Sequence, residues 1–499
     1  MRLLLATFAC TAILQSQTRP ATNCADLRSL TNNELTIAIT VSVPESADAP
    51  AHCRVVGQLL PTVGFEVQMP ADWNGRFVMF GNGGFAGDAL EARGRQLQFG
   101  RAMRRGYATA ATDTGHSAAT EPAATFAANR QKLYDYAFRS LHVTADAAKL
   151  LLRTYYGTGP AKSYFEGCST GGRQGLILAQ RFPDDFDGIT VGAPVLNFTG
   201  TMLRFVQMAK ALKAAPISAA KLPALASRIY DKCDTVDGIK DGVIDDPRRC
   251  DFQPARDLPK CESGSDRADC FTAPQIGAIE TMYSEVKSQG KTIFPAWPVG
   301  PEAPAANGLS GLDPWTIHDA GPTLGMFFGE GFFRYIAFPK PDPNYDIYTF
   351  DIDKDLPKLE AIHQILDATD TDLTRFRNHG GRIFMYFGWA DPALNPMMGV
   401  EYYEGVTRRM GADTPDFFRL FMVPGMLHCS DGVGTDQFDT LGALSAWVEK
   451  GVAPDAVQAS RVVAGSVVRT RPLCAYPEVA KYKGSGSTDD AANFTCVRP

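Results

Sequence analysis

A serine in a glycine-rich turn is the residue of this chain best placed for covalent chemistry. Ser169 is the centre of Gly-Cys-Ser-Thr-Gly over residues 167–171, which fits the G-x-S-x-G pattern of a nucleophile elbow. In such an elbow the serine occupies a strained turn between a strand and a helix, and glycines flank it because a Cβ would collide with neighbouring backbone. Residues 163–165 predict the strand and residues 172–180 the helix. The pattern therefore predicts a serine nucleophile.

A serine hydroxyl becomes a useful nucleophile only when a histidine accepts its proton and an acid orients that histidine. In chains with this elbow the order is serine, acid, histidine, with the last two on loops after late strands. Asp391 and His428 each follow an apolar, strand-like segment in the last quarter of the chain. His116 also follows a strand and is the alternative base, although a structural role in a turn suits it better. We predict that Ser169, Asp391 and His428 form the catalytic triad.

The tetrahedral intermediate of acyl transfer needs hydrogen-bond donors for its negatively charged oxygen. The backbone N–H of Thr170, directly after the serine, is one candidate. Gly83 and Gly84 are candidates for the second donor, because they lie in the early loop Gly-Asn-Gly-Gly at residues 81–84, which resembles the HGGG-type loop of esterases. A simple tight turn is the alternative interpretation of this loop.

Short apolar strands alternate with helical patterns on both sides of the elbow. Strands are predicted at 76–80, 107–113, 163–165, 187–194, 381–389 and 417–423, and a helix at 141–152. This alternation predicts an α/β fold with a mostly parallel, doubly wound sheet and helices on both faces. Proline, glycine and aspartate cluster between the two groups of strands, which predicts a large inserted lid domain. The expected organisation is a signal at 1–21, the α/β domain at 22–195 and 369–499, and the lid at 196–368.

Composition limits the class of protein. The 499 residues have a formal net charge of −6, with 45% hydrophobic and 21% charged residues. These values are ordinary for a globular protein and lack the basic excess that nucleic-acid binding requires. A basic start and an apolar run over residues 3–14 predict a secretory signal, cleaved between Ala12 and Ala21. No later segment is apolar over a length that crosses a membrane. We predict an exported protein, secreted or periplasmic.

Cysteine usage agrees with export. Apart from Cys10 in the signal, ten cysteines remain, with no C-x-x-C pair, which indicates disulfides rather than metal thiolates. Cys233 with Cys250, and Cys261 with Cys270, are close in sequence and are natural local pairs. A bond between Cys168 and Cys429 would tie the nucleophile to the base and fix their separation. The number of cysteines alone leaves the connectivity open.

These motifs resemble the tannase and feruloyl esterase family of α/β-hydrolases. The resemblance is carried by Gly-Cys-Ser-Thr-Gly-Gly at 167–172, Gly-Asn-Gly-Gly-Phe at 81–85, Asp-Thr-Gly-His at 113–116, Gly-Trp-Ala-Asp at 388–391 and His-Cys at 428–429. It implies esterase chemistry and a lid inserted after the elbow. It also implies the disulfides Cys24–Cys53, Cys168–Cys429, Cys233–Cys250, Cys261–Cys270 and Cys474–Cys496.

An aspartate-rich loop follows Cys233 in the lid. Its acids recur every three or four residues beside glycines, a pattern that suits a hard, oxygen-seeking cation such as Ca²⁺ and differs from an EF-hand. An exposed Asp-Gly turn is the other interpretation. The family resemblance implies a calcium site. Its ligands would be the side chains of Asp234, Asp237 and Asp241 and the backbone carbonyls of Ile239 and Val243.

The lid should cover the serine and recognise the substrate. Arg334 and Phe338 lie one helical turn apart in an aromatic-rich segment, where they could present a cation and an aromatic wall on one face. The alternative is that both residues belong to the core of the lid and that Arg334 only extends its charged end to solvent.

We predict a serine esterase for a small aromatic ester of a hydroxycinnamic or gallic acid. The runner-up substrate is a terephthalate monoester, which would require Arg334 to meet the acid. A catalytically silent binding protein on the same scaffold is a third hypothesis, and the oligomeric state stays open.

Overall fold

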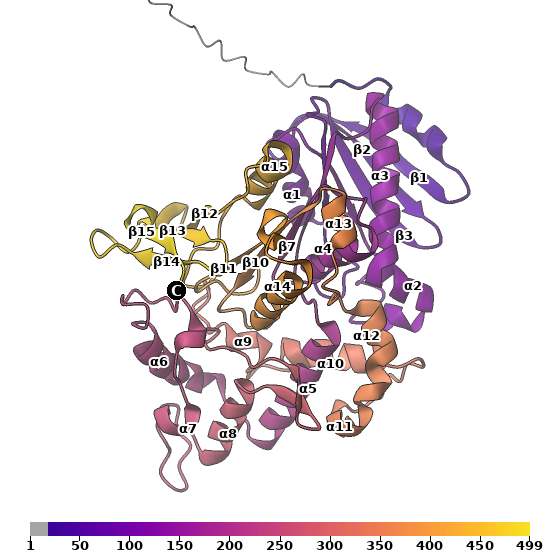
Figure 1. Cartoon of the computed structure of the whole chain (residues 1–499). Helices are drawn as coiled ribbons and strands as arrows, with labels where there is room; N and C mark the ends of the chain where they lie inside the picture. The colour runs from indigo at the N-terminus through magenta and orange to yellow at the C-terminus, as the bar shows by residue number, and fades with distance from the viewer. Residues whose placement is uncertain (1–17) are drawn as a thin grey trace, which may run out of the picture.

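A nine-stranded sheet forms the centre of the computed structural model, which describes residues 18–499 (Figure 1). Most of the predicted signal at 1–21 therefore lies outside the described residues. The strand order is β1-β2-β3-β5-β4-β6-β7-β10-β11. Strands β1, β2, β3 and β5 pair antiparallel in succession, and all pairings from β5 to β11 are parallel. The strands are β1 (Leu35–Val43), β2 (His52–Leu59), β3 (Val63–Pro70), β4 (Arg76–Phe80), β5 (Ala108–Thr112), β6 (Lys162–Cys168), β7 (Gly188–Gly192), β10 (Arg382–Gly388) and β11 (Phe418–Val423).

Successive side chains of the central strands enter two different hydrophobic clusters. Phe77 and Met79 of β4 belong to one cluster, whereas Val78 and Phe80 belong to the other. This alternation is expected of a strand buried on both faces. Helices α3 and α4 supply the first cluster, and α1 and α15 supply the second. The predicted mostly parallel, doubly wound α/β fold is thus confirmed. The helices outside the lid are α1 (Arg93–Arg104), α2 (Arg130–Tyr134), α3 (Ser140–Tyr156), α4 (Thr170–Arg181), α14 (Met397–Met410) and α15 (Thr440–Lys450).

Between β7 and β10 the chain leaves the sheet and forms a helical region, drawn below the sheet in Figure 1. It contains α5 (Phe198–Ala214), α6 (Leu222–Cys233), α7 (Pro254–Asp257), α8 (Ala273–Met282), β8 (Val286–Ser288), β9 (Lys291–Phe294), α9 (Leu312–Trp315), α10 (Leu324–Gly331), α11 (Ile352–Asp355), α12 (Glu360–Leu366) and α13 (Thr374–Asn378). One part has its own apolar cluster around Leu225, Phe271 and Ile279. Helix α5 packs instead into the large cluster of the sheet. The insertion predicted at 196–368 falls within this region.

All five disulfides implied by the family resemblance are present. Cys474–Cys496 joins two C-terminal hairpins that the sequence did not predict, formed by β12 (Ala456–Val463), β13 (Ser466–Cys474), β14 (Val479–Tyr482) and β15 (Phe494–Val497). Within residues 18–499, no helix combines the length and apolar character needed to span a membrane.

Candidate active site

Ser169 lies between the end of β6 and the start of α4, as the elbow motif predicts. Its φ of +63° is in the left-handed region that side chains rarely adopt, and its N–H donates to the carbonyl of Gly192 at 3.0 Å. A Cβ on Gly167 would come within 2.5 Å of the Gly171 backbone. The glycines are therefore a steric condition for the turn that exposes the serine hydroxyl.

Asp391 and His428 meet in a short hydrogen bond. The Nδ1 atom of His428 lies 2.8 Å from Oδ2 of Asp391, a fully buried carboxylate. The other oxygen, Oδ1, accepts the N–H groups of Ala393 and Leu394 at 2.8 and 2.9 Å. The carboxylate is thus fixed from both sides, and it holds the ring of His428 with Nε2 free for a second partner.

The disulfide Cys168–Cys429 joins the elbow to the histidine loop, with its Cα atoms 6.0 Å apart. Ser169 and His428 line the same cavity, whose volume is about 840 Å³. No hydrogen bond joins Ser169 Oγ to His428 in this structure. Such contacts are often long without substrate and tighten when it binds, so the arrangement is compatible with a nucleophile and its base.

The two predicted sources of oxyanion donors lie side by side. The hydroxyl of Thr170 donates to the carbonyl of Gly84 at 2.6 Å, which ties the elbow to the early glycine loop. Position 84 favours glycine because its φ is +51°, whereas a Cβ on Gly83 would meet no atom within 4 Å. In the described part of the chain the N–H groups of Gly83 and Gly84 donate to no other group. Both are therefore available to a ligand.

Three side chains that the sequence did not single out hold this loop in place. Arg95 donates to the carbonyl of Gly81 at 2.9 Å, and Gln174 accepts the N–H of Asn82 at 2.9 Å. Tyr136 donates to the carbonyl of Gly84 at 3.2 Å. These contacts join residues far apart in the sequence, so the motif alone gave no signal for them.

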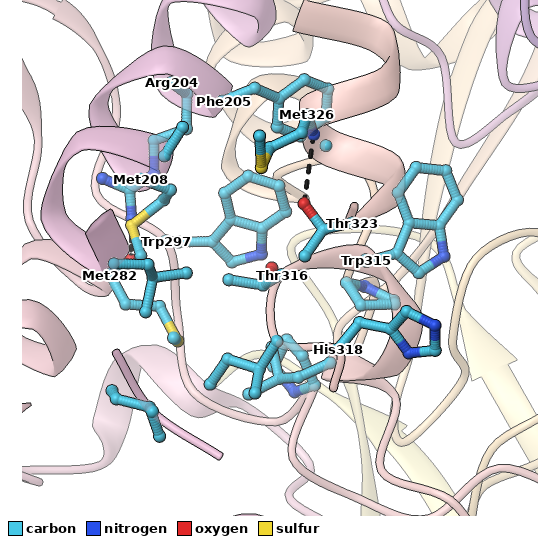
Figure 2. Close-up of a pocket in the computed structure, with 18 of the residues that line it drawn as sticks. Arg204, Phe205, Met208, Met282, Trp297, Trp315, Thr316, His318, Thr323 and Met326 are labelled. Carbon is cyan, nitrogen blue, oxygen red and sulfur yellow. Dashed lines mark hydrogen bonds between the residues drawn. The ribbon is translucent and has the colours of Figure 1, made fainter. Parts of the chain in front are cut away.

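The cavity has two unlike walls. One wall is apolar and is formed by α5 with the segment before it, by other parts of the lid, and by the loop after Asp391. Its residues are Val195, Phe198, Met202, Phe205, Trp315, Phe328 and Leu394. The wall formed by α1 and nearby segments is polar and includes Asp88, Arg95, Gln98, Arg101 and Glu166. Trp315 stands edge-on to the ring of His428, with the ring centroids 5.6 Å apart. Phe205 and Trp315 also line a second cavity in the lid (Figure 2).

Comparison with known proteins identifies the family. The model of the family described as tannase and feruloyl esterase matches residues 47–497. This chain belongs to that family. A mono(2-hydroxyethyl) terephthalate hydrolase of Piscinibacter sakaiensis is 34% identical, and the match covers 92% of this chain and 87% of that protein. Feruloyl esterase B of Aspergillus niger is 31% identical, over 87% of this chain and 83% of its own.

A crystal structure of feruloyl esterase B from Aspergillus oryzae has the same fold. The TM-score is 0.83 at 28% sequence identity, and the match covers 95% of this chain and 99% of that one. As a member of the tannase and feruloyl esterase family, the chain is a carboxylic ester hydrolase, as predicted.

The predicted substrate contacts lie elsewhere in this esterase. Neither Arg334 nor Phe338 lines the cavity of Ser169. Arg334 forms an ion pair with Glu330 at 3.0 Å, and Phe338 packs on Tyr345 with ring centroids 5.1 Å apart. Both side chains therefore make their contacts within the lid rather than with the cavity of Ser169. The alternative interpretation, lid core with a partly exposed arginine, describes them better.

The apolar wall was missed, although one signal for it exists in the sequence. Phe198, Met202 and Phe205 are spaced by four and three residues on α5, which puts them on one helix face. The helix begins shortly after a predicted strand of the sheet, so this face was a reasonable candidate for the apolar wall of the site.

His116, the alternative base, is a structural residue. Its buried ring stacks on Phe126 with centroids 3.8 Å apart, and burial lowers its pKa to about 4. Nδ1 lies 3.3 Å from the hydroxyl of Thr114. His116 therefore has the structural role in the turn, and its side chain does not line the cavity of Ser169.

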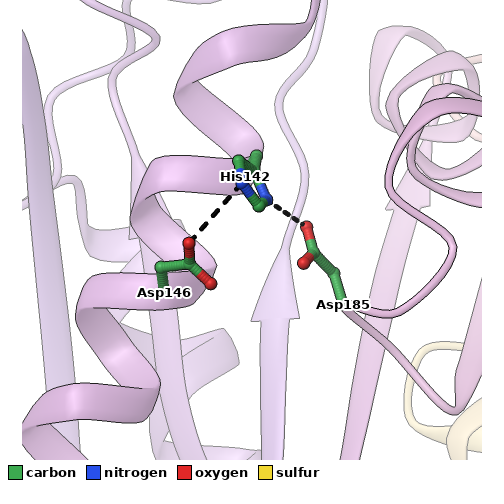
Figure 3. Close-up of side chains that lie close together, drawn as sticks. All are labelled: His142, Asp146 and Asp185. Atoms are coloured by element: carbon green, nitrogen blue, oxygen red, sulfur yellow. Dashed lines mark hydrogen bonds and ion pairs between the residues drawn. The ribbon is translucent and has the colours of Figure 1, made fainter.

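A histidine and two carboxylates meet outside the active site (Figure 3). Nδ1 of His142 lies 2.9 Å from Asp185 and Nε2 lies 3.5 Å from Asp146, while the ring stacks on Phe182. Because the imidazole already contacts both acids, the group is satisfied within the protein, and it joins α3 to the loop after α4.

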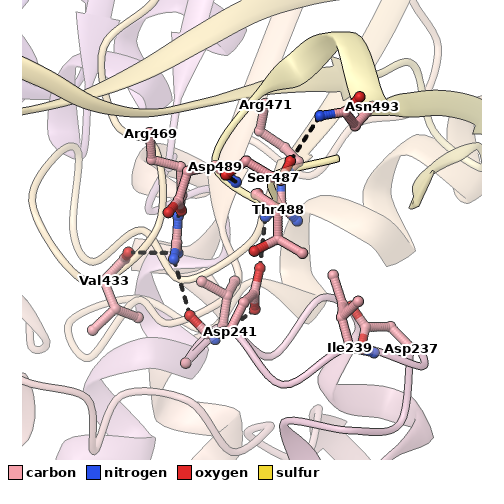
Figure 4. Close-up of polar contacts among 12 residues, drawn as sticks. Asp237, Ile239, Asp241, Val433, Arg469, Arg471, Ser487, Thr488, Asp489 and Asn493 are labelled. Carbon is pink, nitrogen blue, oxygen red and sulfur yellow. Dashed lines mark hydrogen bonds and ion pairs between the residues drawn. The ribbon is translucent and has the colours of Figure 1, made fainter. Parts of the chain in front are cut away.

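The aspartate loop is tied to the C-terminal hairpins (Figure 4). Asp241 Oδ2 forms an ion pair with Arg471 at 2.7 Å, and both side chains are less than 5% exposed. Its carbonyl accepts from Arg469 at 2.9 Å. Asp245 is also buried, and its Oδ1 has no hydrogen-bond partner. Burial and the nearby acids Asp237 and Asp246 raise the pKa of Asp245 to about 7.

Proposed function

We propose that this enzyme hydrolyses esters of neutral aromatic acids, of the hydroxycinnamic or gallic type, with Ser169 as the nucleophile. The observation that carries the proposal is that His428, hydrogen-bonded to the buried Asp391, lines the same cavity as Ser169, and that this cavity has an apolar, aromatic wall. Relatives named feruloyl esterase and a structural neighbour of the same name support this choice of acid.

The proposed reaction follows from the geometry. Ser169 Oγ attacks the ester carbonyl while His428 Nε2 takes its proton, and Asp391 stabilises the charged ring. The N–H groups of Thr170 and of Gly83 or Gly84 bind the oxyanion. The intermediate collapses to an acyl-enzyme as His428 returns the proton to the departing alcohol. Water, activated by His428, then attacks the acyl group and frees the acid and Ser169.

The apolar wall separates the two candidate acyl groups. A ferulate or gallate ring is neutral, so it can lie against Phe328 and Trp315 without losing the solvation of a charge. A terephthalate monoester would place its second carboxylate on the acyl side. That carboxylate needs a cation, but Arg334 does not reach the cavity, and the apolar wall offers none. The arginines that line the cavity, Arg95 and Arg101, belong to its polar wall, and Arg95 already donates to the carbonyl of Gly81 at 2.9 Å. The structure therefore favours the hydroxycinnamic or galloyl ester over the terephthalate ester.

A hydrolysis panel tests this proposal. Methyl ferulate, methyl gallate and a terephthalate monoester should be compared by kcat/KM, with a fluorophosphonate probe to label the nucleophile. We expect ferulate or gallate to be preferred and Ser169 to carry the label. A terephthalate preference would assign the runner-up substrate. An unlabelled, inactive but folded protein would support the silent binding protein instead.

We also propose that the aspartate loop binds Ca²⁺ in a structural role. The buried, unpartnered oxygen of Asp245 and the surplus of carboxylates in the loop fit a cation. Asp234, Asp237 and Asp241 would hold it together with the carbonyls of Ile239 and Val243. The ion would neutralise carboxylates that the protein alone leaves uncompensated, and the disulfide Cys233–Cys250 closes the loop.

Export is the last part of the proposal. Five disulfides are typical of proteins that fold in an oxidising compartment, and the apolar run at residues 3–14 fits a secretory signal. Sequencing the N-terminus of the protein recovered from its host would test this. We expect a start between residues 13 and 22.

A further inference from the structure

The lid contains a second cavity of about 520 Å³, next to the catalytic one (Figure 2). This volume lies in the range of small-molecule sites. Met208 and Met282 face it from α5 and α8, and Trp297 and Met326 close it from other parts of the lid. Methionine walls adapt their shape and make favourable contacts with aromatic rings. The lining therefore suits a flat, apolar guest.

Two aromatic side chains separate this lid cavity from the catalytic cavity. Phe205 and Trp315 line both. Trp315 stacks on Phe328, with centroids 5.9 Å apart and planes inclined by 9°, and stands edge-on to His428. A guest in the lid cavity would thus lie behind the wall against which the proposed substrate ring packs. The two chambers present the same kind of surface.

The charged groups of the lid cavity already have partners. Arg204 donates to the carbonyl of Thr281 at 2.7 Å, and Glu302 accepts from the hydroxyl of Tyr283 at 2.6 Å. Burial raises the pKa of Glu302, which favours its neutral form. Lys213 also lines the cavity, and its Nζ lies 3.7 Å from the centroid of the Tyr348 ring. A charged guest would have to displace one of these contacts or remain without a counter-ion, so a neutral guest is favoured.

Side-chain atoms of His318 and Thr316 are available for a hydrogen bond. Nδ1 of His318 is held by Asp313 at 2.7 Å, which leaves its Nε2 without a partner in the described chain. The hydroxyl of Thr316 likewise has no hydrogen-bond partner among residues 18–499. Both residues line the cavity, and Figure 2 shows His318 at its lower edge. One or two hydroxyl or ether oxygens on the guest could be satisfied there.

We propose that the lid cavity is a second binding site, for a neutral aromatic molecule of one ring with a short side chain and a hydroxyl or ether group. Its occupant touches the segment that carries the catalytic acid. Trp297, part of the wall, donates from Nε1 to the carbonyl of Asp391 at 3.0 Å, and Pro392 lines the cavity as well. The enzyme therefore has two aromatic chambers on either side of Trp315.

A binding experiment on blocked enzyme tests the inference. Ser169 is first modified with a fluorophosphonate that fills the catalytic cavity, and coniferyl alcohol, a neutral phenol without an ester, is titrated by calorimetry. We expect one molecule to bind to the blocked enzyme, with a negative heat-capacity change from apolar burial. Loss of all binding on blocking would overturn the inference, because coniferyl alcohol would then occupy only the catalytic cavity.

Variants on α5 locate the site. Ala209 lines the lid cavity and is buried, so Ala209→Phe should fill the space and weaken binding by about tenfold or more. Ala214→Phe, at an exposed position of the same helix, is the matched control and should bind like the wild type. Leu212→Trp serves as a second filling variant if Ala209→Phe fails to fold. Unchanged binding in a folded filling variant would overturn the proposal.

The inference stands apart from the proposed function. If the fluorophosphonate does not label Ser169, the proposed nucleophile is wrong, and the titration is then made on the Ser169→Ala protein. Two molecules of coniferyl alcohol are expected there, one in each cavity, with one of them lost in Ala209→Phe. A single molecule that Ala209→Phe does not displace would contradict the second site alone.

Discussion

The nucleophile elbow and the aspartate loop of the lid both hold polar groups in tight turns, but their bonding differs. In the elbow region each oxygen of Asp391 has a hydrogen-bond partner, and the backbone of Ser169 is tied to the neighbouring strand. In the aspartate loop one oxygen of Asp245 is buried without a partner. Asp241 depends on Arg471, which comes from 230 residues further along the chain.

This difference separates two properties of the molecule. At the active site the carboxylate of Asp391 and the backbone of Ser169 find their partners within the protein, and the groups left free are those that face the cavity. In the aspartate loop the buried carboxyl of Asp245 keeps one oxygen without a partner, and burial and the neighbouring acids raise its pKa. We therefore expect changes at the elbow to reduce activity with little loss of stability, and changes at the loop to do the reverse.

The largest effect should come from Ser169→Ala. Activity should fall by about 10³-fold or more, since no positioned nucleophile remains. The melting temperature should stay the same, because the hydroxyl of Ser169 makes no hydrogen bond within the described chain. Hydrolysis of methyl ferulate and thermal unfolding measure the two properties. A variant with a tenth of wild-type activity would exclude Ser169 as the nucleophile.

Asp391→Asn should lower kcat by about 10²- to 10⁴-fold with little change in KM. The asparagine oxygen can still accept from Ala393 and Leu394, so the loop should keep its shape. Its amide would face Nδ1 of His428 and favour the wrong tautomer. Steady-state kinetics check the split between kcat and KM. Near-normal turnover would show that another acid orients His428.

The disulfide next to the proposed triad should matter more for activity than the one in the C-terminal hairpins. Replacing both Cys168 and Cys429 with alanine should lower kcat by about tenfold, since small misplacements of nucleophile and base are costly. Replacing Cys474 and Cys496 should leave kcat close to the wild type, although both double variants lose stability. Kinetics well below the melting temperature separate the two effects. Equal kcat losses would contradict a positional role for Cys168–Cys429.

The parts of the molecule that could be predicted are those fixed by short-range geometry. A strand, a glycine turn and a helix define the elbow within 15 residues or so, and strand ends define where Asp391 and His428 can lie. The strands of the parallel sheet were found from their apolar runs. The C-terminal hairpins are local, but much of β12 and β13 is exposed, so these strands lack the buried apolar run that marks the strands of the central sheet. The pairing of Asp241 with Arg471 joins segments 230 residues apart, which a single sequence does not encode locally.

The apolar wall of the cavity also shows what a single sequence leaves undecided. Helical spacing shows which residues share a face, but it does not show which face turns toward the site. Arg334 and Phe338 satisfied the spacing and face the lid core, whereas Phe198, Met202 and Phe205 satisfied it and face Ser169. Only the packing of the lid on the sheet decides between such faces.

The smallest effect on activity should come from removing the proposed calcium ion, which tests the aspartate-loop side of the comparison. A chelator should lower the melting temperature by a few degrees, because a ligand at about 100 times its Kd stabilises the folded state by about 2.7 kcal/mol. Turnover of methyl ferulate at 25 °C should change by less than about twofold, because the aspartate loop does not line the cavity of Ser169.

Asp237→Asn should remove the calcium response, while Asp231→Asn, at an exposed position on α6 before the loop, should retain it. Differential scanning calorimetry with added Ca²⁺ or chelator, together with elemental analysis, provides the measurement. A melting temperature that the chelator does not move, in protein free of metal, would count against the site. A large loss of turnover without a change in stability would instead reverse the comparison, since the loop would then act on the catalytic residues through the lid rather than on the folded state.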